Sequence, residues 1–142
     1  MKSIKTNQDR IIIGKLSPDE DVIDNVTEIV NKNNIKSGSI NIIGALKKLT
    51  LGYFVIEKKD YQFKTFEEDV ELVSCMGNIA FKEGDPIIHL HCIVARDDYS
   101  LLGGHLGQPS IISVTGEVII HVTQEKLQRA NDPRFNLSLL KL

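Results

Sequence analysis

The sequence is poor in cysteine, in net charge and in long apolar runs, and each shortage excludes a class of protein. Its two cysteines, Cys75 and Cys92, are too few for a disulfide framework and too isolated for a cysteine-based zinc site. Seventeen basic and nineteen acidic residues give a formal net charge of -2, whereas proteins that bind nucleic-acid phosphates usually carry a basic excess. No apolar run approaches the roughly 18 residues that span a bilayer.

Several catalytic and targeting signatures are also missing. The chain has no phosphate-cradling glycine loop, no nucleophile-elbow serine and no pair of redox thiols. Its first ten residues are polar and lack the apolar region of a secretory signal peptide, so we expect a cytoplasmic protein. The 142 residues, of which 42% are hydrophobic and 25% charged, suffice for one domain with a buried core. We therefore predict a single domain over residues 1–142.

One amphipathic helix is predicted in the N-terminal part of the chain. Ser17 is a candidate N-cap, Pro18 suits the first helical position, and Glu20 completes a capping box. The apolar residues that follow recur at helical spacing, namely Val22, Ile23, Val26, Ile29 and Val30. This helix is expected to place one face on a core and to end near residues 33–34.

Most of the remaining sequence is typical of β-strands. Segments rich in β-branched, aromatic and other apolar residues predict strands at 10–16, 39–46, 49–57, 61–66, 70–79, 86–96 and 111–123. Short connections between these segments favour antiparallel pairing, because parallel crossovers need about a dozen residues or more. The predicted fold class is α+β, with a mainly antiparallel β-sheet packed against one main helix. The longest irregular segment expected between strands is 97–109.

Three histidines, His89, His91 and His105, form the main candidate site. Residues i and i+2 of a strand share a face, so His89 and His91 are expected to project side by side, away from the core. His105 follows Gly103 and Gly104 on the expected loop, and it would complete a three-histidine face. Such a face leaves a fourth metal position open, as in catalytic zinc sites. The alternative is that these are core or solvent-facing histidines that bind nothing.

Other polar residues are secondary candidates. Glu117, on the strand after the loop, is a candidate general base or partner of the metal site, and an exposed sheet position is the alternative. Arg96 is a candidate for binding an anionic ligand, and an ordinary surface arginine is the simpler interpretation. His121 is expected to be a surface residue near a strand end. Cys75 and Cys92 are predicted to be small buried apolar residues, with Cys92 facing away from the histidine pair.

Short motifs occur in order along nearly the whole chain. They are Gly44-Ala45-Leu46, Leu51-Gly52-Tyr53, Glu71-Leu72-Val73-Ser74, Gly77-Asn78-Ile79, His89-Leu90-His91, Gly103-Gly104-His105-Leu106, Glu117-Val118, Asp132-Pro133 and Asn136-Leu137. The two histidine motifs are the most specific. On these residues the chain resembles the plants and prokaryotes conserved (PPC) domain, in its stand-alone prokaryotic form.

The resemblance implies an α+β domain with an antiparallel sheet that assembles as a homotrimer. The PPC fold is also similar to that of acetolactate decarboxylase, a zinc enzyme with a comparable histidine pair and third histidine. This similarity supports Zn2+ on His89, His91 and His105 and does not transfer the reaction. Plant members carry an AT-hook that binds DNA, and stand-alone members are often labelled candidate DNA-binding proteins. The Arg-Gly-Arg-Pro core of an AT-hook is missing here.

The function that these inferences favour is a homotrimeric PPC-domain protein whose three-histidine zinc site binds a small anionic or carbonyl ligand. Glu117 is then the first acid–base candidate for a reaction that the sequence does not assign. Two alternatives stay open. One is a DNA-associated or regulatory assembly module without catalysis, and the other is an oligomerisation scaffold that holds neither metal nor ligand.

Overall fold

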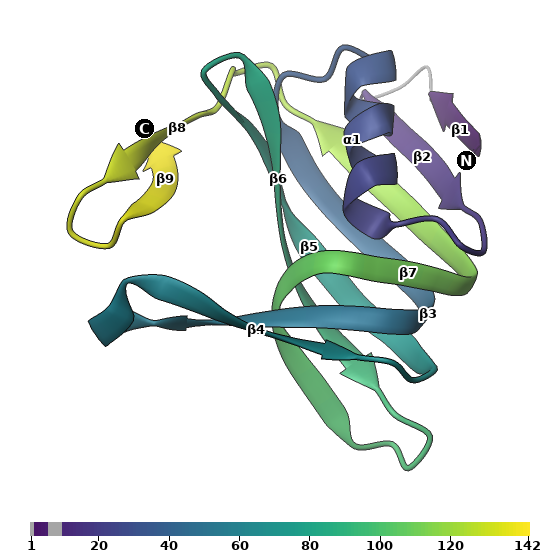
Figure 1. Cartoon of the computed structure of the whole chain (residues 1–142). Coiled ribbons are helices and arrows are strands. Elements are labelled where there is room, and N and C mark those ends of the chain that lie inside the picture. The colour runs from purple at the N-terminus through teal and green to yellow at the C-terminus, as the bar shows by residue number, and fades with distance from the viewer. Residues whose placement is uncertain (1, 6–9) are drawn as a thin grey trace.

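The computed structural model describes residues 2–5 and 10–142 and consists mainly of β-strands (Figure 1). Part of the polar N-terminal stretch, residue 1 and residues 6–9, lies outside the described residues. The elements are β1 (Lys2–Lys5), β2 (Ile11–Leu16), α1 (Val22–Lys32), β3 (Gly38–Val55), the 3-10 turn η1 (Ile56–Lys58), β4 (Asp60–Phe66), β5 (Val70–Lys82), β6 (Asp85–Ala95), β7 (Leu101–Val122), β8 (Gln128–Asp132) and β9 (Leu137–Lys141).

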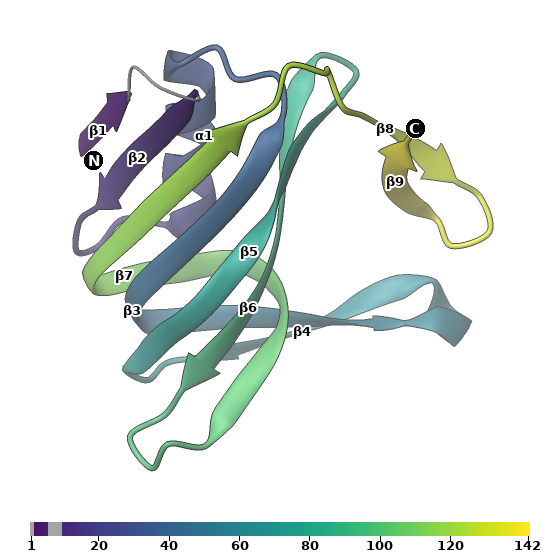
Figure 2. The same ribbon diagram turned by 180° about the vertical axis from the view of Figure 1, so that it is seen from behind.

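The strands pair almost entirely antiparallel, which confirms the predicted α+β fold class. Strand β7 pairs with β2 and β3, strand β3 pairs with β5 and β4, and strand β5 pairs with β6. The first residues of β7 also pair with β6, so β7, β3, β5 and β6 form a closed ring of strands. Figure 2 shows β7, β3, β5 and β6 in this order. Both parts of β7 thus pair with β3, and the first part closes the ring by pairing with β6 as well.

The helix α1 begins later than the sequence indicates, so the prediction of Ser17 as N-cap is wrong. The N-cap is Asp21, whose carboxylate accepts a hydrogen bond of 2.9 Å from the backbone N–H of Ile23. Glu20 accepts one of 2.8 Å from the backbone N–H of Ser17, so the predicted capping pair lies in the turn before the helix. The predicted end near residues 33–34 is confirmed.

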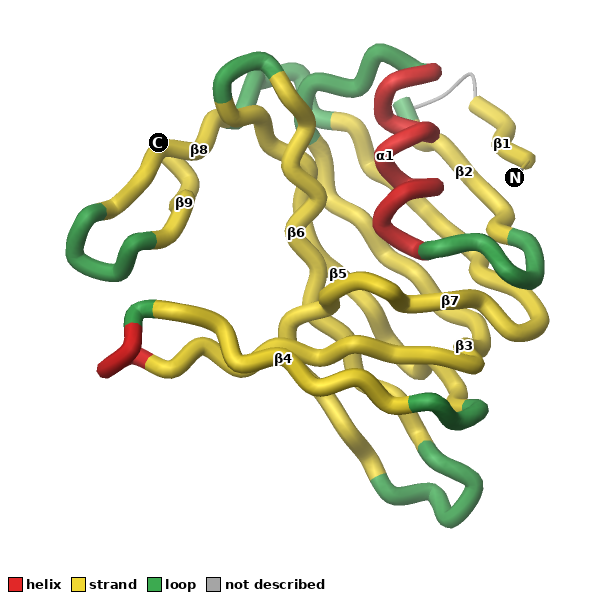
Figure 3. The backbone as a smooth tube through the Cα atoms, viewed as in Figure 1, coloured by secondary structure: helices red, strands yellow, loops and turns green. Residues whose placement is uncertain are grey.

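The apolar side of α1 covers one face of the strands and builds the core with them (Figure 3). The helix packs against β2, β6 and β7 through its buried residues, which are Val22, Val26, Ile29 and Val30. Alternate residues of the strands face this core, among them Ile42, Leu72, Leu90 and Val118. Among the described residues, no helix is long and apolar enough to cross a membrane.

The predicted strands at 39–46 and 49–57 are one continuous strand, β3. Its register with β7 shifts between Gly44 and Leu46 and again on either side of Lys48, so the strand bends without ending. The polar residue Lys48 fits within it because its Nζ lies 2.7 Å from the carboxylate of Glu67. The break expected between residues 46 and 49 is therefore absent.

Two hairpins extend from the ring on the same side of the molecule (Figures 1 and 2). One is formed by the second half of β3 with β4, and the other by β8 with β9. The strand interpretation of the sequence did not include the C-terminal hairpin. It joins the ring through one parallel pair, Phe81 with Gln128, and a hydrogen bond of 2.9 Å from the Phe81 N–H to the Leu127 carbonyl.

Candidate metal centre

Strand β6 places His89 and His91 side by side, as the alternation of its residues predicts. The residues between and after them, Leu90, Cys92 and Val94, are buried in the core. His91 is exposed and His89 is half-buried. The core therefore fixes which face of β6 carries the two imidazoles.

His105 lies on strand β7, where it pairs directly with His91 of β6. The prediction that it belongs to an irregular segment at 97–109 is wrong, because β7 begins at Leu101. The two glycines before it permit close strand packing rather than a loop. An ideal Cβ at Gly103 would lie 2.9 Å from the carbonyl oxygen of Cys92, and one at Gly104 would lie 2.9 Å from that of Gly52.

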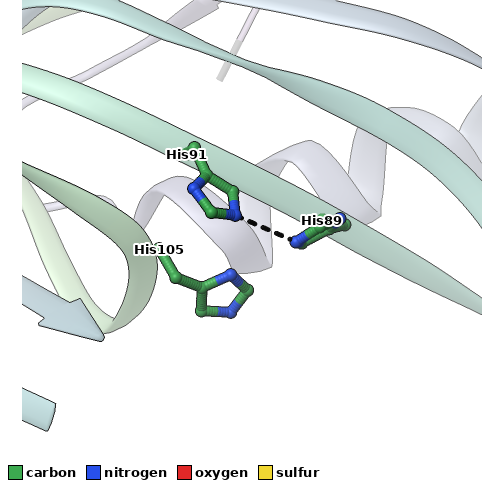
Figure 4. A group of neighbouring side chains, drawn as sticks. All are labelled: His89, His91 and His105. Carbon is green, nitrogen blue, oxygen red and sulfur yellow. Dashed lines mark hydrogen bonds between the residues drawn. The ribbon is translucent and has the colours of Figure 1, made fainter. Parts of the chain in front are cut away.

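The three imidazole rings face a common point (Figure 4). Ring centroids lie 5.1 Å apart for His89 and His91, 5.1 Å for His89 and His105, and 5.3 Å for His91 and His105. Each ring offers one nitrogen within 4.8 Å of the others, and the Nε2 atoms of His89 and His91 are 3.2 Å apart. Nitrogens this close can share one ion at the roughly 2.0–2.1 Å that zinc prefers.

The environment of the cluster favours the neutral form of its imidazoles. Burial lowers the pKa of His89 to about 4, and the charges of Arg129, His105 and His91 add to the shift. Burial also lowers the pKa of His105 to about 4, helped by His91 and Arg129. Near pH 7 these two rings therefore keep the lone pairs that metal ligands need.

One donor atom of the cluster has no other partner. The Nδ1 of His105 is buried and makes no hydrogen bond to any described residue. A buried nitrogen left without a partner is unfavourable, since it has given up its hydrogen bonds to water. Its position among two other imidazole nitrogens fits a bound cation, which would satisfy it.

Two residues beside the cluster are absent from the sequence prediction. Tyr61 of β4 stacks on His105, with ring centroids 4.5 Å apart and an interplanar angle of 29°. Arg129 of β8 places Nη2 3.1 Å from Nδ1 of His89 and donates a hydrogen bond of 2.8 Å to Asn78 Oδ1. They belong to the two extended hairpins. The only sequence signal for either is the alternation of aromatic residues Tyr61 and Phe63 along β4.

Glu117 is not brought to the histidines. It lies on the second part of β7, exposed, and pairs with Lys15 of β2 and Ile43 of β3. His105, on the first part of that strand, pairs with Gly52 of β3 instead. Within one chain, Glu117 therefore lies at an exposed position of the sheet, which is the alternative interpretation given above.

The other candidates have local roles. Arg96 forms two hydrogen bonds, of 2.8 and 3.1 Å, with the carboxylate of Glu68. His121 is exposed near the end of β7, as expected. The predicted burial of Cys75 and Cys92 is confirmed, and burial raises the pKa of the Cys92 thiol to about 11. Both thiols are therefore protonated near neutral pH and act as small apolar side chains.

Known proteins match this chain by family and by fold. The model of the Plants and Prokaryotes Conserved (PCC) domain matches residues 3–124, which include all three histidines and end before β8. No curated protein matches the sequence.

Solved structures show the same architecture. A candidate DNA-binding protein from Bacteroides thetaiotaomicron is 31% identical, with 98% of this chain and 96% of that one covered and a TM-score of 0.91. A metal-containing protein from Archaeoglobus fulgidus is 28% identical, with 100% of both chains covered and a TM-score of 0.86.

The fold extends to a known enzyme. Acetolactate decarboxylase from Bacillus subtilis is 17% identical, with a TM-score of 0.59, and the match covers 87% of this chain and 57% of the enzyme. Identity this low shows a common fold and leaves the reaction open. The similarity to the acetolactate decarboxylase fold, which the resemblance to the PPC family implies, is thereby confirmed.

Proposed function

This chain belongs to the Plants and Prokaryotes Conserved (PCC) domain family, and from that membership we propose that it is a homotrimeric metal-binding protein. In this proposal His89, His91 and His105 hold one divalent ion, zinc, which binds a small anionic or carbonyl ligand. The buried Nδ1 of His105, without a hydrogen-bond partner in the described structure and facing two other imidazoles, carries the proposal. The metal-containing protein from Archaeoglobus fulgidus, 28% identical, supports it.

The protein's own residues would hold and orient the ion. When bound, zinc supplies Lewis acidity to an oxygen of the ligand. The pairing of β6 with β7 fixes His91 opposite His105, and the Tyr61 ring stacked on His105 restricts rotation of that imidazole. His91 pairs with Met76 of β5, so the cluster lies on the face of the sheet through which the subunits are proposed to assemble. We propose no reaction, because no carboxylate of the described chain lies in the cluster.

Elemental mass spectrometry of the protein without a histidine tag tests this function. We expect about one zinc per chain, because three imidazoles at this spacing can bind one ion. Dialysis against a chelator should remove the metal, and added zinc should restore it to the same level. Protein without metal, even after incubation with zinc, would contradict the proposal and favour the assembly or DNA-binding alternatives.

The outer face of the sheet supports assembly into a trimer. Large apolar side chains are exposed on this face, opposite α1, namely Ile13, Ile43, Val73, Met76, Ile93, Val114 and Ile119. They come from neighbouring strands. Ile13 of β2 pairs with Ile119 of β7, and Ile119 pairs in turn with Asn41 of β3. An apolar face of this kind marks an interaction surface, and the proposed occupant is further copies of the same chain.

Replacing Ile43 with aspartate should convert the trimer to single chains. Ile43 is 55% exposed on the outer face, and a buried unpaired carboxylate would oppose association there. Size-exclusion chromatography with light scattering should report one chain's mass for Ile43→Asp and three for the parent. Ile56→Asp, the same substitution at the tip of the β3–β4 hairpin, is the control and should stay trimeric. A parent protein with the mass of one chain would refute the trimer.

DNA binding is the second candidate function. It is favoured by the similarity to a candidate DNA-binding protein from Bacteroides thetaiotaomicron, at 31% identity. The formal net charge of -2 opposes it, because affinity for duplex DNA comes largely from neutralised phosphates. The metal-binding function is therefore the one that we adopt.

A further inference from the structure

Arg129 contacts one of the two ring nitrogens of His89, and the histidine cluster contacts the other. Nη2 of Arg129 lies 3.1 Å from Nδ1 of His89 and donates a hydrogen bond of 2.8 Å to Asn78 Oδ1. Nε2 of His89 faces the cluster and lies 3.2 Å from Nε2 of His91 (Figure 4). The two nitrogens of a single imidazole therefore serve two different neighbours.

The contact with Arg129 fixes the position of the proton on His89. A guanidinium has only N–H donors and stays protonated in proteins, so Nδ1 of His89 must be the acceptor of this hydrogen bond. In a neutral imidazole one nitrogen accepts and the other carries the proton. The proton of neutral His89 is therefore on Nε2, the nitrogen that faces the cluster.

This proton also engages His91. Because Nε2–H of His89 is the donor of the 3.2 Å contact, Nε2 of His91 accepts it with its lone pair. Arg129, His89 and His91 thus form a chain of two hydrogen bonds with one direction. The buried Nδ1 of His105, in contrast, has no hydrogen-bond partner among the described residues.

A bound ion needs the opposite arrangement at His89. A histidine that ligates a metal through Nε2 carries its proton on Nδ1 and usually donates it to a carboxylate or a carbonyl. Arg129 presents a second donor to that nitrogen, and two N–H groups that face each other repel. An ion can therefore use Nε2 of His89 only when the proton moves to Nδ1 and the guanidinium withdraws.

We infer that Arg129 is a positioning residue that sets the affinity of the metal site, because it holds His89 in the tautomer that cannot ligate an ion. The inference rests on the proposed metal-binding function. Arg129 lies on β8, and the C-terminal hairpin joins the ring through one residue pair and one backbone hydrogen bond at Phe81. The position of this hairpin decides whether Arg129 reaches His89. Ion binding at the cluster is thereby coupled to the C-terminal hairpin.

Nitrogen NMR of isotope-labelled, metal-free protein near pH 7 measures the tautomer of His89 directly. In the parent we expect a protonated Nε2 and an unprotonated Nδ1, with the His89 signals identified by their absence from His89→Gln. Arg129→Gln should lose this preference, because the glutamine amide can accept as well as donate. Arg134→Gln, the same substitution in the turn of the same hairpin, should match the parent. A parent His89 that carries its proton on Nδ1 would overturn the inference.

Zinc affinity separates this inference from the proposed function. Competition with a coloured chelator should show zinc bound at least about 10-fold more tightly by Arg129→Gln than by the parent, since the ion no longer displaces a charge-assisted hydrogen bond. Arg129→Met, which has no N–H donor in its side chain, should also bind zinc more tightly than the parent. Arg134→Gln removes the same charge from the hairpin and should leave the affinity unchanged.

Two results contradict different parts of this account. If folded Arg129→Gln and Arg129→Met bind zinc no more tightly than the parent, the role of Arg129 is refuted and the proposed metal site stands. If none of these proteins binds zinc, the proposed function is refuted, and the control of its affinity by Arg129 with it.

Discussion

Replacing His91 with alanine is expected to lower zinc affinity by about 100-fold or more, because the cluster loses one of its three ligands. The Nε2 of His91 lies 3.2 Å from that of His89, so the remaining pair cannot enclose an ion from three sides. Competition with a coloured chelator measures the affinity. The exposed side chain contributes little to the core, so the unfolding free energy should change by less than about 0.5 kcal/mol.

The fourth histidine provides the matched control. His121 is exposed near the end of β7 and pairs with Ile11 and Ser39, away from the cluster. His121→Ala should bind zinc as the parent does. If His91→Ala and His121→Ala hold equal zinc, the assignment of the metal to this cluster fails. If His91→Ala and His121→Ala both lose zinc to the same extent, the zinc is bound by other residues than this cluster alone.

Replacing Gly77 of strand β5 with alanine should lower the stability of the protein substantially. An ideal Cβ at Gly77 would lie 1.7 Å from the carbonyl oxygen of His89 on the neighbouring strand β6. The two strands must separate at that point, and we expect the unfolding free energy to fall by about 2–3 kcal/mol. Chemical denaturation monitored by circular dichroism gives this value.

The same substitution connects the packing of β5 to the proposed metal site. Displacement of the His89 backbone should also weaken zinc binding, although no ligand has been removed. Glu71→Ala, at an exposed position of β5, is the control and should leave both properties near those of the parent. An unchanged denaturation midpoint for Gly77→Ala would show that β5 and β6 can separate there at little cost in free energy.

Part of the candidate metal centre follows from local sequence alone. Alternation along β6 is a property of any strand, so the side-by-side placement of His89 and His91 needed only the strand to be recognised. The position of His105 was harder to predict, because Gly103 and Gly104 are also typical of loops. Their actual role depends on the Cys92 and Gly52 backbones, which belong to the neighbouring strands β6 and β3. Close packing between distant strands leaves no local pattern.

The start of α1 illustrates a competition between two caps. Ser17 and Glu20 carry the spacing of a capping box, yet Asp21 caps the helix. Asp21 also accepts a hydrogen bond of 2.8 Å from the backbone N–H of Ser110, a contact that forms only when β7 is in place. Tertiary structure therefore selects the N-cap, and a local motif cannot predict that selection.

Tyr61 and Arg129 could not be assigned to the site from sequence. Each comes from a hairpin that extends from the ring, and neither has a motif that separates it from other surface residues. The antiparallel fold class and the paired histidines were within reach of pattern alone. Tyr61 and Arg129 lie beside the cluster only because of the positions that the two hairpins take relative to the ring of strands.

The pairing of β2 with β7 also has a consequence for synthesis on the ribosome. Ile11 pairs with His121 and Leu16 with Gly116, so most of the chain lies between the partners. The nascent β2 and α1 emerge first, and their apolar faces stay uncovered until β6 and β7 have been translated. Folding with such distant contacts is slow, because loop closure must precede the contacts that stabilise it. The early segments should therefore be the part of the nascent chain that chaperones bind longest.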